Sequence, residues 1–474
     1  MKKLIIIAFI LVGAISCTND FSEWNIDAKK ATEVPASTLF SNAERNLVRT
    51  LKSQNVNSNI FNFMAQYWTA TTYPDESNYD LGSRDVSGGF WDELYTDVLI
   101  DLKESSRVLN AKTATLAPSL LPKNKNQLAV VSILEVYTYH VLVDVFGDVP
   151  FTEALDIDNS SPKYDDDTAI YAALFAQLDA AISDLDASAS SFGSADFIYE
   201  GDVSSWEKFA NSLKLRMALR VKDGAKISSA IAGGVFTSNA DNAAFKFLSS
   251  APYSNPLWEV LVQSGRSDVL VSDTFVNIIA PLNDPRTPAY MDDNQDPYIG
   301  GPYGANNAFG EFTHLGTIFH EPAFEGIILD YAEVKFLLAE AAARGLGGVT
   351  NAETHYNEAI TASIDYWVTE TEADAATYLA QSTVAYDATN WEKSIGMQKY
   401  IALYSHGFEG WASWRVFGYP ELTAPAEAHA SAEGMVPVRF TYPADESQRN
   451  GDSYKAASAA IGGDKFSSRI FWNK

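Results

Sequence analysis

The feature that most constrains this chain is a succession of long segments with helical periodicity. Apolar residues recur at i, i+3, i+4 and i+7 in residues 38–53, 88–109, 126–147, 168–185, 204–222, 328–346, 351–368 and 391–414. No segment of comparable length alternates apolar and polar residues, which is the pattern of a half-buried strand. We therefore predict a mainly α fold with little β structure, a short strand at residues 437–441 being the exception.

Two of the late segments predict a helical hairpin. The stretch LLAEAAARGL ends the first of them, and a short turn separates it from HYNEAITASIDYWV in the second. Small alanine side chains allow two antiparallel helices to approach closely. The arrangement resembles tetratricopeptide-type units without their strict repeat period. We expect tetratricopeptide-like helical hairpins connected by long irregular loops.

The helical pattern stops between about residues 248 and 324. This region contains LNDPRTPAYMDDNQDPYIGGPYGANNAFGEF, which is dense in Pro, Gly, Asn and Tyr. Long irregular segments in a compact protein are usually functional loops. We interpret residues 248–324 as a loop-rich insert within a single helical domain that comprises residues 38–474.

The first residues have the layout of an export signal. Lys2 and Lys3 precede an apolar run over residues 4–12, and small residues follow. The run is shorter than the roughly 20 residues that a spanning helix requires. We predict a signal peptide over residues 1–16.

Cys17 is the only cysteine, so the chain has no partner for an internal disulfide. It directly follows Ala14-Ile15-Ser16 at the expected cleavage point. This resembles the lipobox of bacterial lipoproteins, in which the cysteine becomes the acylated N-terminus. Residues 17–37 are then a lipidated N-terminus and a polar tether, and the acyl chains hold the protein at a membrane.

Composition limits the partners. The formal net charge is −27, with acidic residues scattered along the chain, which argues against nucleic acid as a ligand. The 10 Trp and 23 Tyr exceed what a plain helical core needs and are typical of carbohydrate or interface surfaces. The sequence contains no Gly-rich phosphate loop, Cys-x-x-Cys pair or nucleophile elbow, so we expect no cofactor.

Aromatic residues on polar loops are the candidate ligand contacts. A Trp or Tyr ring can stack on the apolar face of a sugar while short polar side chains bind its hydroxyls. The loop QYWTATTYPDESNYD and the central insert both combine these residue types. The alternative is that the rings pack under their own loops, and for the ring in GGFWDELY, at the start of a helix, a core role is equally plausible. The candidates are Trp68, Tyr73, Tyr79, Trp91, Tyr290, Tyr298, Tyr303 and Asn306.

Neither a catalytic site nor a metal site is predicted. Asp75 and Glu76 provide two carboxylates, as glycoside hydrolysis requires, but adjacent loop residues generally point apart. His314 and His320 do not have the HExxH spacing, and Pro322 blocks a continuing helix. We interpret both pairs as structural.

Four arginines are also assigned structural roles. Arg216 and Arg220, four residues apart on a helix, are expected to form ion pairs inside the scaffold. Arg415 and Arg439 lie among aromatic residues and are expected to stack on rings and to bind carbonyl groups of irregular chain.

Taken together, several segments resemble the SusD/RagB family of outer-membrane nutrient-binding lipoproteins, specifically its SusD-like branch. The resemblance covers nearly the whole chain in the family's order. One departure is Val416, where many members carry a second arginine. The segments are the leader that ends at Cys17, QYWTATTYPDESNY, VFGDVPFTEAL, SSWEKFANSLKLRMALR, NDPRTPAY, YAEVKFLLAEAAARG, QKYIALYSHGFEGWASWRVFGYPEL and VPVRFTYPADESQRN.

The resemblance implies a binding protein that is not an enzyme. Such proteins are lipid-anchored at the surface of the outer membrane and cover a TonB-dependent transporter barrel, for which they capture oligosaccharides or peptides. The expected ligand surface is an arc of aromatic rings on loops. We therefore expect oligosaccharide capture, with peptide capture as an alternative within the family. A surface-anchored glycoside hydrolase and a purely structural envelope protein are the alternatives from other classes.

Overall fold

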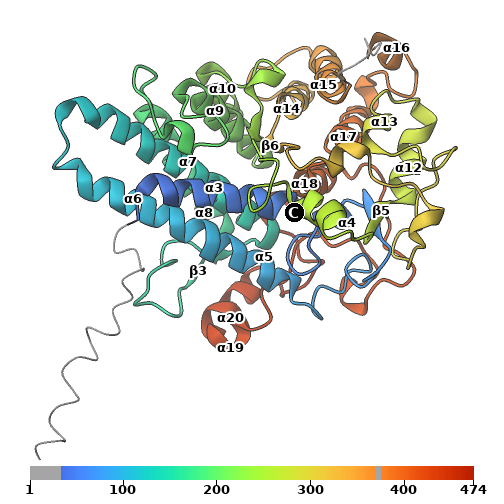
Figure 1. The fold of residues 1–474 in the computed structure, drawn as a ribbon, viewed down its shortest axis with the longest axis horizontal. Coiled ribbons are helices and arrows are strands. Elements are labelled where there is room, and N and C mark those ends of the chain that lie inside the picture. The colour runs from blue at the N-terminus through green and yellow to red at the C-terminus, as the bar shows by residue number, and fades with distance from the viewer. Residues whose placement is uncertain (1–33, 369–374) are drawn as a thin grey trace, which may run out of the picture.

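The computed structural model describes residues 34–368 and 375–474. The predicted signal peptide, Cys17 and most of the tether lie outside these residues. Within them the fold is mainly α, as predicted (Figure 1). The helices are α3 (Ala36–Lys52), α4 (Phe61–Met64), α5 (Val86–Leu94), α6 (Ile100–Thr113), α7 (Leu121–Phe146), α8 (Asp167–Asp184), α9 (Val203–Arg220), α10 (Gly224–Gly233), α11 (Pro256–Trp258), α12 (Asp273–Ile279), α13 (Thr287–Tyr290), α14 (Tyr331–Ala343), α15 (Ala352–Trp367), α16 (Ala375–Leu379), α17 (Trp391–Ala402), α18 (Gly407–Phe417), α19 (Glu446–Arg449) and α20 (Gly451–Ala460).

Consecutive helices pack as antiparallel neighbours. The pairs α7 and α8, α9 and α10, and α14 and α15 lie side by side (Figure 1). Ala339 and Ala341 of α14 are buried, so the predicted close approach of this hairpin is confirmed. Aspartates start several of these helices. The Asp202 side chain accepts from backbone amides at the start of α9, and Asp330 does the same for α14.

Helix α7 runs through the middle of the helical layer. By length and composition it could cross a membrane, but 83% of its most apolar window is buried inside the protein. It contacts α6, α8 and α9. These contacts explain its apolar character, since a helix that is covered on most sides needs little polar surface.

The β structure is limited to short pairs that tie loops together. The strands are β1 (Trp68–Ala70), β2 (Val149–Pro150), β3 (Tyr164–Asp165), β4 (Ala243–Phe245), β5 (Val269–Val271) and β6 (Gly326–Leu329), paired antiparallel as β1 with β5, β2 with β3, and β4 with β6. The prediction of a strand at residues 437–441 is wrong, because this segment has no regular secondary structure. Its amides bond to helix ends and loops instead. The Phe440 amide donates to the Val145 carbonyl over 3.0 Å.

A buried ion cluster joins five helices, with Asp144 of α7 lying 3.2 Å from Arg220 of α9. Arg216 of α9 pairs with Glu333 of α14 at 2.7 Å, and Arg220 pairs with Glu409 of α18 at 2.6 Å. Lys399 of α17 lies 3.5 Å from Glu409. Burial opposes ionisation of Glu409, but Arg220, Arg216 and Lys399 outweigh it and hold the pKa of Glu409 well below its usual value. The predicted ion pairs of Arg216 and Arg220 are thus confirmed.

The other two arginines anchor irregular chain, as predicted. The Arg415 guanidinium lies 3.7 Å from the centroid of the Trp411 ring and donates to the Asp144 carbonyl over 2.7 Å. Burial lowers the pKa of Arg415 to about 9. Arg439 donates to the Phe146 carbonyl over 3.0 Å. Both residues therefore fix the C-terminal segment against the end of α7.

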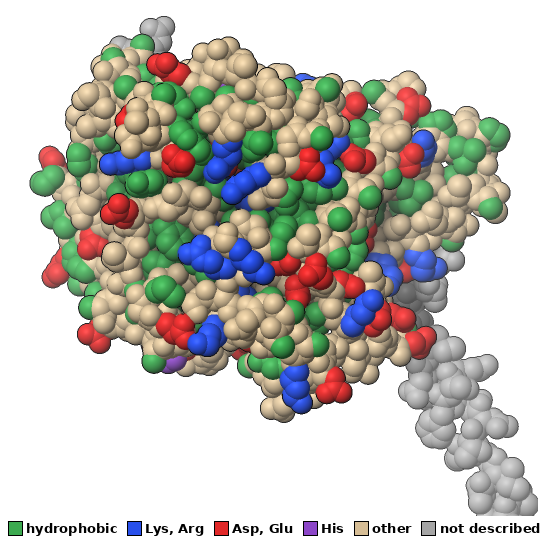
Figure 2. Space-filling model, turned by 180° about the vertical axis from the view of Figure 1, so that it is seen from behind, with side chains coloured by type: hydrophobic (Ala, Val, Ile, Leu, Met, Phe, Trp, Pro, Cys, Tyr) green, Lys and Arg blue, Asp and Glu red, His purple; other side chains and the backbone are tan. Residues whose placement is uncertain are grey.

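Surface charges of both signs are mixed. On the face opposite to that of Figure 1, acidic and basic side chains lie next to each other with apolar side chains between them (Figure 2). The acidic excess of the whole sequence is therefore not gathered into one region of this face.

We predict that Glu409→Gln lowers the free energy of unfolding by about 3–5 kcal/mol, because it leaves the buried Lys399 without a counter-charge and removes one of the two carboxylates that Arg220 and Arg216 each contact. Urea denaturation followed by circular dichroism measures the change. Glu104→Gln is the control, because it removes one carboxylate from the exposed pair with Arg107 and should leave the unfolding midpoint nearly unchanged. Equal midpoints for both variants would contradict a stabilising role of the cluster.

Candidate ligand-binding site

Most of the predicted stacking rings are buried. Trp68 is 1% exposed, Trp91 8%, and Tyr79 and Tyr290 are both 0%. These four side chains have no free face for a ligand, so the expectation that they stack on one is corrected. Trp68 is covered because it lies in β1, whose partner Val271 comes from the central insert. The alternative interpretation, that the rings pack under loops, holds for these residues.

The remaining candidates lie at or near the surface. Tyr303 and Tyr298 are half-buried, and Asn306 is exposed. The Tyr303 hydroxyl donates to the Phe63 carbonyl over 2.6 Å, which fixes its ring. Tyr73 is 41% exposed. A ligand role for these four residues stays a prediction.

Two cationic side chains lie near the Tyr73 ring. The guanidinium carbon of Arg84 lies 4.9 Å from the ring centroid, and that of Arg266 lies 5.6 Å from it. A sugar that stacks on Tyr73 competes with these arginines for the ring, which makes it a weaker platform than its exposure suggests.

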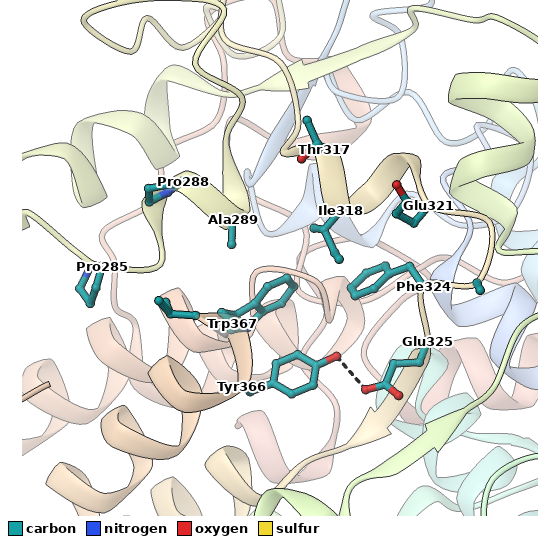
Figure 3. A pocket seen from close by; sticks show the side chains of 12 residues that line it. Pro285, Pro288, Ala289, Thr317, Ile318, Glu321, Phe324, Glu325, Tyr366 and Trp367 are labelled. Atoms are coloured by element: carbon teal, nitrogen blue, oxygen red, sulfur yellow. Dashed lines mark hydrogen bonds between the residues drawn. The ribbon is translucent and has the colours of Figure 1, made fainter. Parts of the chain in front are cut away.

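Phe324, Tyr366 and Trp367 line a hollow with aromatic walls (Figure 3). Its volume is about 870 Å³. The walls come from the loop around α13, from residues 317–325 and from the C-terminal end of α15. We call it the aromatic hollow. Its lining residues are Pro285, Pro288, Ala289, Thr317, Ile318, Glu321, Ala323, Phe324, Glu325, Tyr366, Trp367 and Val368.

Trp367 is the largest ring of the aromatic hollow, and the core supports it from behind. Its centroid lies 4.9 Å from that of Tyr290 in an edge-to-face contact. Phe324 and Phe319 lie 6.0 Å and 6.1 Å from it. The buried Tyr290 thus packs against the side of Trp367 that faces the core and holds this ring in position.

The end of α15 explains why two rings meet here. Tyr366 and Trp367 are its last two residues, and Val368 continues in an extended conformation. Successive residues of a helix point in directions about 100° apart, so the pair cannot face the core together. Both rings are only half-buried, and they line different parts of the wall (Figure 3).

The polar groups of the aromatic hollow are mainly acceptors. The Tyr366 hydroxyl donates to Glu325 Oε1 over 3.0 Å (Figure 3). Burial and then the Glu325 carboxylate raise the pKa of Tyr366 well above its usual value, so this hydroxyl stays protonated and keeps donating. Glu321 is exposed on the opposite side of Phe324. Apolar ring faces beside carboxylate oxygens suit a ligand that has both C–H faces and hydroxyl or amine donors.

A small enclosed cavity lies behind the aromatic hollow. It shares Phe324, Glu325 and Tyr366 with it, and Trp68 and Lys52 are among the other lining residues. Its volume is only about 10 Å³, which suits one water molecule. Trp68 is therefore close to the site, but it belongs to the wall behind it.

The acidic and histidine pairs have structural surroundings. Arg84 contacts the buried Glu76 at 2.5 Å, whereas Asp75 is exposed. Arg84 also lies 3.8 Å from the Asp75 carboxylate, so the same arginine contacts both acidic residues and this pair is an ion-pair site. The His314 ring stacks on Phe309 with centroids 3.9 Å apart.

Three other carboxylates in the described part of the chain lie close enough to share a cation, with ligand atoms within 4.8 Å of one another. These belong to Asp148, Asp166 and Asp167. Each already accepts a backbone amide proton, from Asp167, Ala169 and Phe471 respectively. Their evident role is to fix the start of α8 and the C-terminal residues.

We predict that Trp68→Ala lowers the free energy of unfolding by about 3–5 kcal/mol, because it empties a buried position between Phe319 and Tyr404. Tyr73→Ala is the matched control and should cost about 1 kcal/mol or less, since this ring is largely solvated. Chemical denaturation of both variants checks the difference. A Trp68→Ala variant as stable as the parent would show that its burial is incidental.

Comparisons with known proteins agree on the family. A SusD-like family model described as "Starch-binding associating with outer membrane" matches residues 28–443. The solved structure of a Bacteroidetes SusD-like protein superposes with a TM-score of 0.79 at 23% identity, covering 93% of this chain and 100% of that one.

Two further structures are similar in the same way. A chitin-binding SusD homologue from Flavobacterium johnsoniae gives a TM-score of 0.78 at 24% identity over 93% of this chain and 98% of that one. A SusD homologue from Bacteroides uniformis gives a TM-score of 0.78 at 24% identity and covers 92% of this chain and 99% of that one. No functionally curated protein sequence matches. Since the family model covers most of its length, the chain belongs to the SusD-like family of starch-binding proteins that associate with the outer membrane.

Proposed function

We propose that this protein is a surface-exposed nutrient-binding lipoprotein that captures oligosaccharides in the aromatic hollow and delivers them to a TonB-dependent outer-membrane transporter. The observation that carries the proposal is the wall formed by Trp367, Tyr366 and Phe324 around a volume of about 870 Å³. Small-molecule sites typically have volumes of roughly 300–1,000 Å³ and combine apolar walls with a few polar groups.

The chemistry of the wall favours a glycan. The exposed part of Trp367 offers a flat apolar surface to the C–H face of a sugar ring, and Glu321 and Glu325 offer acceptors to its hydroxyl groups. Because Tyr290 holds Trp367 from behind, the ring is in place before the ligand arrives. One protein of similar structure is a chitin-binding SusD homologue, which supports an oligosaccharide ligand here.

The exposed loop residues extend this proposal. Tyr73, Tyr298, Tyr303 and Asn306 are proposed as secondary contacts for a long glycan chain. None of them lines the aromatic hollow. Their contribution to affinity is therefore expected to be smaller than that of Trp367.

The proposal includes no bond cleavage. Glu325 is engaged by Tyr366, and Glu321 is solvated, which suits acceptors that bind hydroxyl groups. The family itself is described by starch binding. A surface glycoside hydrolase would need two carboxylates that flank one scissile bond.

We predict that Trp367→Ala weakens oligosaccharide binding at least about tenfold, because it removes the largest apolar surface of the aromatic hollow. Isothermal titration calorimetry against a panel of neutral oligosaccharides measures the loss, and circular dichroism verifies that the variant is folded. Tyr73→Ala is the control ring outside the hollow and should retain at least half of the affinity.

Other outcomes of the same panel would overturn the proposal. Unchanged affinity in folded Trp367→Ala would place the ligand elsewhere. Release of reducing ends from the panel would show a hydrolase. Binding of peptides with no binding of glycans would favour the peptide-capturing alternative.

We predict that Cys17→Ala abolishes acylation and moves the protein from the outer-membrane fraction to the soluble fraction, because each buried acyl methylene contributes about 0.8 kcal/mol to membrane binding. Incorporation of labelled palmitate and membrane fractionation measure both effects. The parent protein, purified from solubilised outer membranes, should carry a TonB-dependent barrel with it. Membrane retention of Cys17→Ala would contradict the lipid anchor, and purification without a barrel would contradict delivery to a transporter.

A further inference from the structure

The charges of the aromatic hollow are all of one sign. Its lining contains the carboxylates of Glu321 and Glu325 and no lysine or arginine among the described residues. Neither carboxylate forms an ion pair with a basic side chain in residues 34–368 and 375–474, whereas Glu333, Glu409 and Asp284, which are buried, each do. The aromatic hollow therefore carries negative charge that the described protein does not neutralise locally.

The rings of the aromatic hollow are free of cations as well. Several rings elsewhere have a lysine or arginine over their faces, such as Trp411 with Arg415 and Trp391 with Arg344. Within the described residues, no such contact involves Trp367, Tyr366 or Phe324. Their electron-rich faces are therefore available to a cationic ligand.

The nearest basic groups are committed to other contacts. Lys52 lines the enclosed cavity behind the wall, where its ammonium group donates to the Ser405 carbonyl over 3.0 Å. Burial lowers the pKa of Lys52 to about 7, and Lys52 is not among the residues that line the aromatic hollow. Arg286, which directly follows Pro285, is buried and pairs with Asp284 at 2.6 Å. Burial lowers the pKa of His320, the residue before Glu321, which favours its neutral form.

We propose that the aromatic hollow selects glycans by charge: it binds an amino sugar with a protonated amine more tightly than the neutral acetamido sugar of the same length, and it rejects uronate and sulfated glycans. The selecting residues are Glu321 and Glu325, together with the face of Trp367. This inference rests on the function proposed above and specifies the ligand class of the same site.

The physical argument compares three ligands on one surface. All three can stack a C–H face on Trp367. An ammonium group adds attraction to the ring face and a charge-assisted hydrogen bond to a carboxylate. An acetamido group adds only neutral contacts, and a ligand carboxylate or sulfate meets Glu321 and Glu325 as like charges without a cation to receive it.

The net negative charge of the whole protein attracts any cationic ligand and repels any anionic one. The test has to separate this general attraction from the contribution of Glu321 and Glu325. The formal net charge is −27, and acidic side chains occur at several places on the face shown in Figure 2. Glu427 is exposed and does not line the aromatic hollow. Glu427→Gln therefore removes the same charge as Glu321→Gln at a position outside the hollow, which makes the two variants a matched pair.

The test is isothermal titration calorimetry on the mature protein with tetramers of glucosamine, N-acetylglucosamine and galacturonate, at low salt and in a slightly acidic buffer that keeps the amine protonated. We expect the glucosamine tetramer to bind about five- to tenfold tighter than the acetamido tetramer, and the galacturonate tetramer to show no measurable binding. Added salt should lower the affinity for the glucosamine tetramer and leave the affinity for the acetamido tetramer nearly unchanged. Glu321→Gln should reduce the ratio of the two affinities at least about twofold, and Glu427→Gln should preserve it.

The outcomes separate the two proposals. Equal affinities for the amino and acetamido tetramers, or galacturonate binding as tight as either, would overturn charge selection while oligosaccharide capture stands. The same reduction in Glu321→Gln and Glu427→Gln would also overturn it, because a general field would then explain the preference. Absence of binding for all three tetramers and for the neutral panel would overturn both proposals.

Discussion

The packing of aromatic rings around Tyr404 is the interaction on which the loop-rich half of the structure depends. Tyr404 follows α17, and its ring lies 4.4 Å from Phe275 of α12, 4.7 Å from Tyr290 of α13 and 6.3 Å from Trp68 of β1, all between centroids. These rings come from segments that have few regular hydrogen bonds of their own. Since each buried aromatic side chain removes a large apolar area from water, the cluster replaces the missing secondary structure as the source of order. Trp367 then rests on Tyr290, so the candidate binding surface is an outer layer of this cluster.

Helix positions could be predicted because their cause is local. The stripe in residues 38–53 corresponds to α3, and the stripes in residues 126–147 and 204–222 correspond to α7 and α9. A helix with one apolar face must bury that face wherever it packs, so the periodicity in the sequence is enough to place it. The strand expected at residues 437–441 failed for the opposite reason. That segment is held by contacts with distant parts of the chain: Arg415 of α18 donates to the Val438 carbonyl, and Arg439 donates to the Phe146 carbonyl.

The types of side chain at the candidate site could be predicted from the sequence, but the residues that line the hollow could not be identified from it. Aromatic rings beside polar side chains are present at a hollow, but Trp68 and Tyr79 are not the exposed ones. Burial of Trp68 is decided by its strand partner in a distant segment, and a single sequence without aligned relatives does not reveal this pairing. Tyr366 and Trp367 were not recognised as candidates, because they belong to a segment whose helical periodicity suggested burial in the core. The available signal was their adjacency at a helix end, because two neighbouring rings cannot both point into one core.

The treatment of carboxylates distinguishes the scaffold from the site. In the scaffold, Glu409 and Glu333 are fully buried and each meets an arginine at short range, since an unpaired buried charge would destabilise the fold. At the aromatic hollow, Glu321 and Glu325 keep contact with solvent and have no basic partner among the described residues. A lysine or arginine at this wall would neutralise the carboxylates. The sequence contains 34 such residues, and none of them lines the hollow. Leaving both carboxylates without a basic partner beside a half-buried tryptophan suits a ligand that supplies positive charge or hydrogen-bond donors, because charges that the protein does not neutralise are available for recognition.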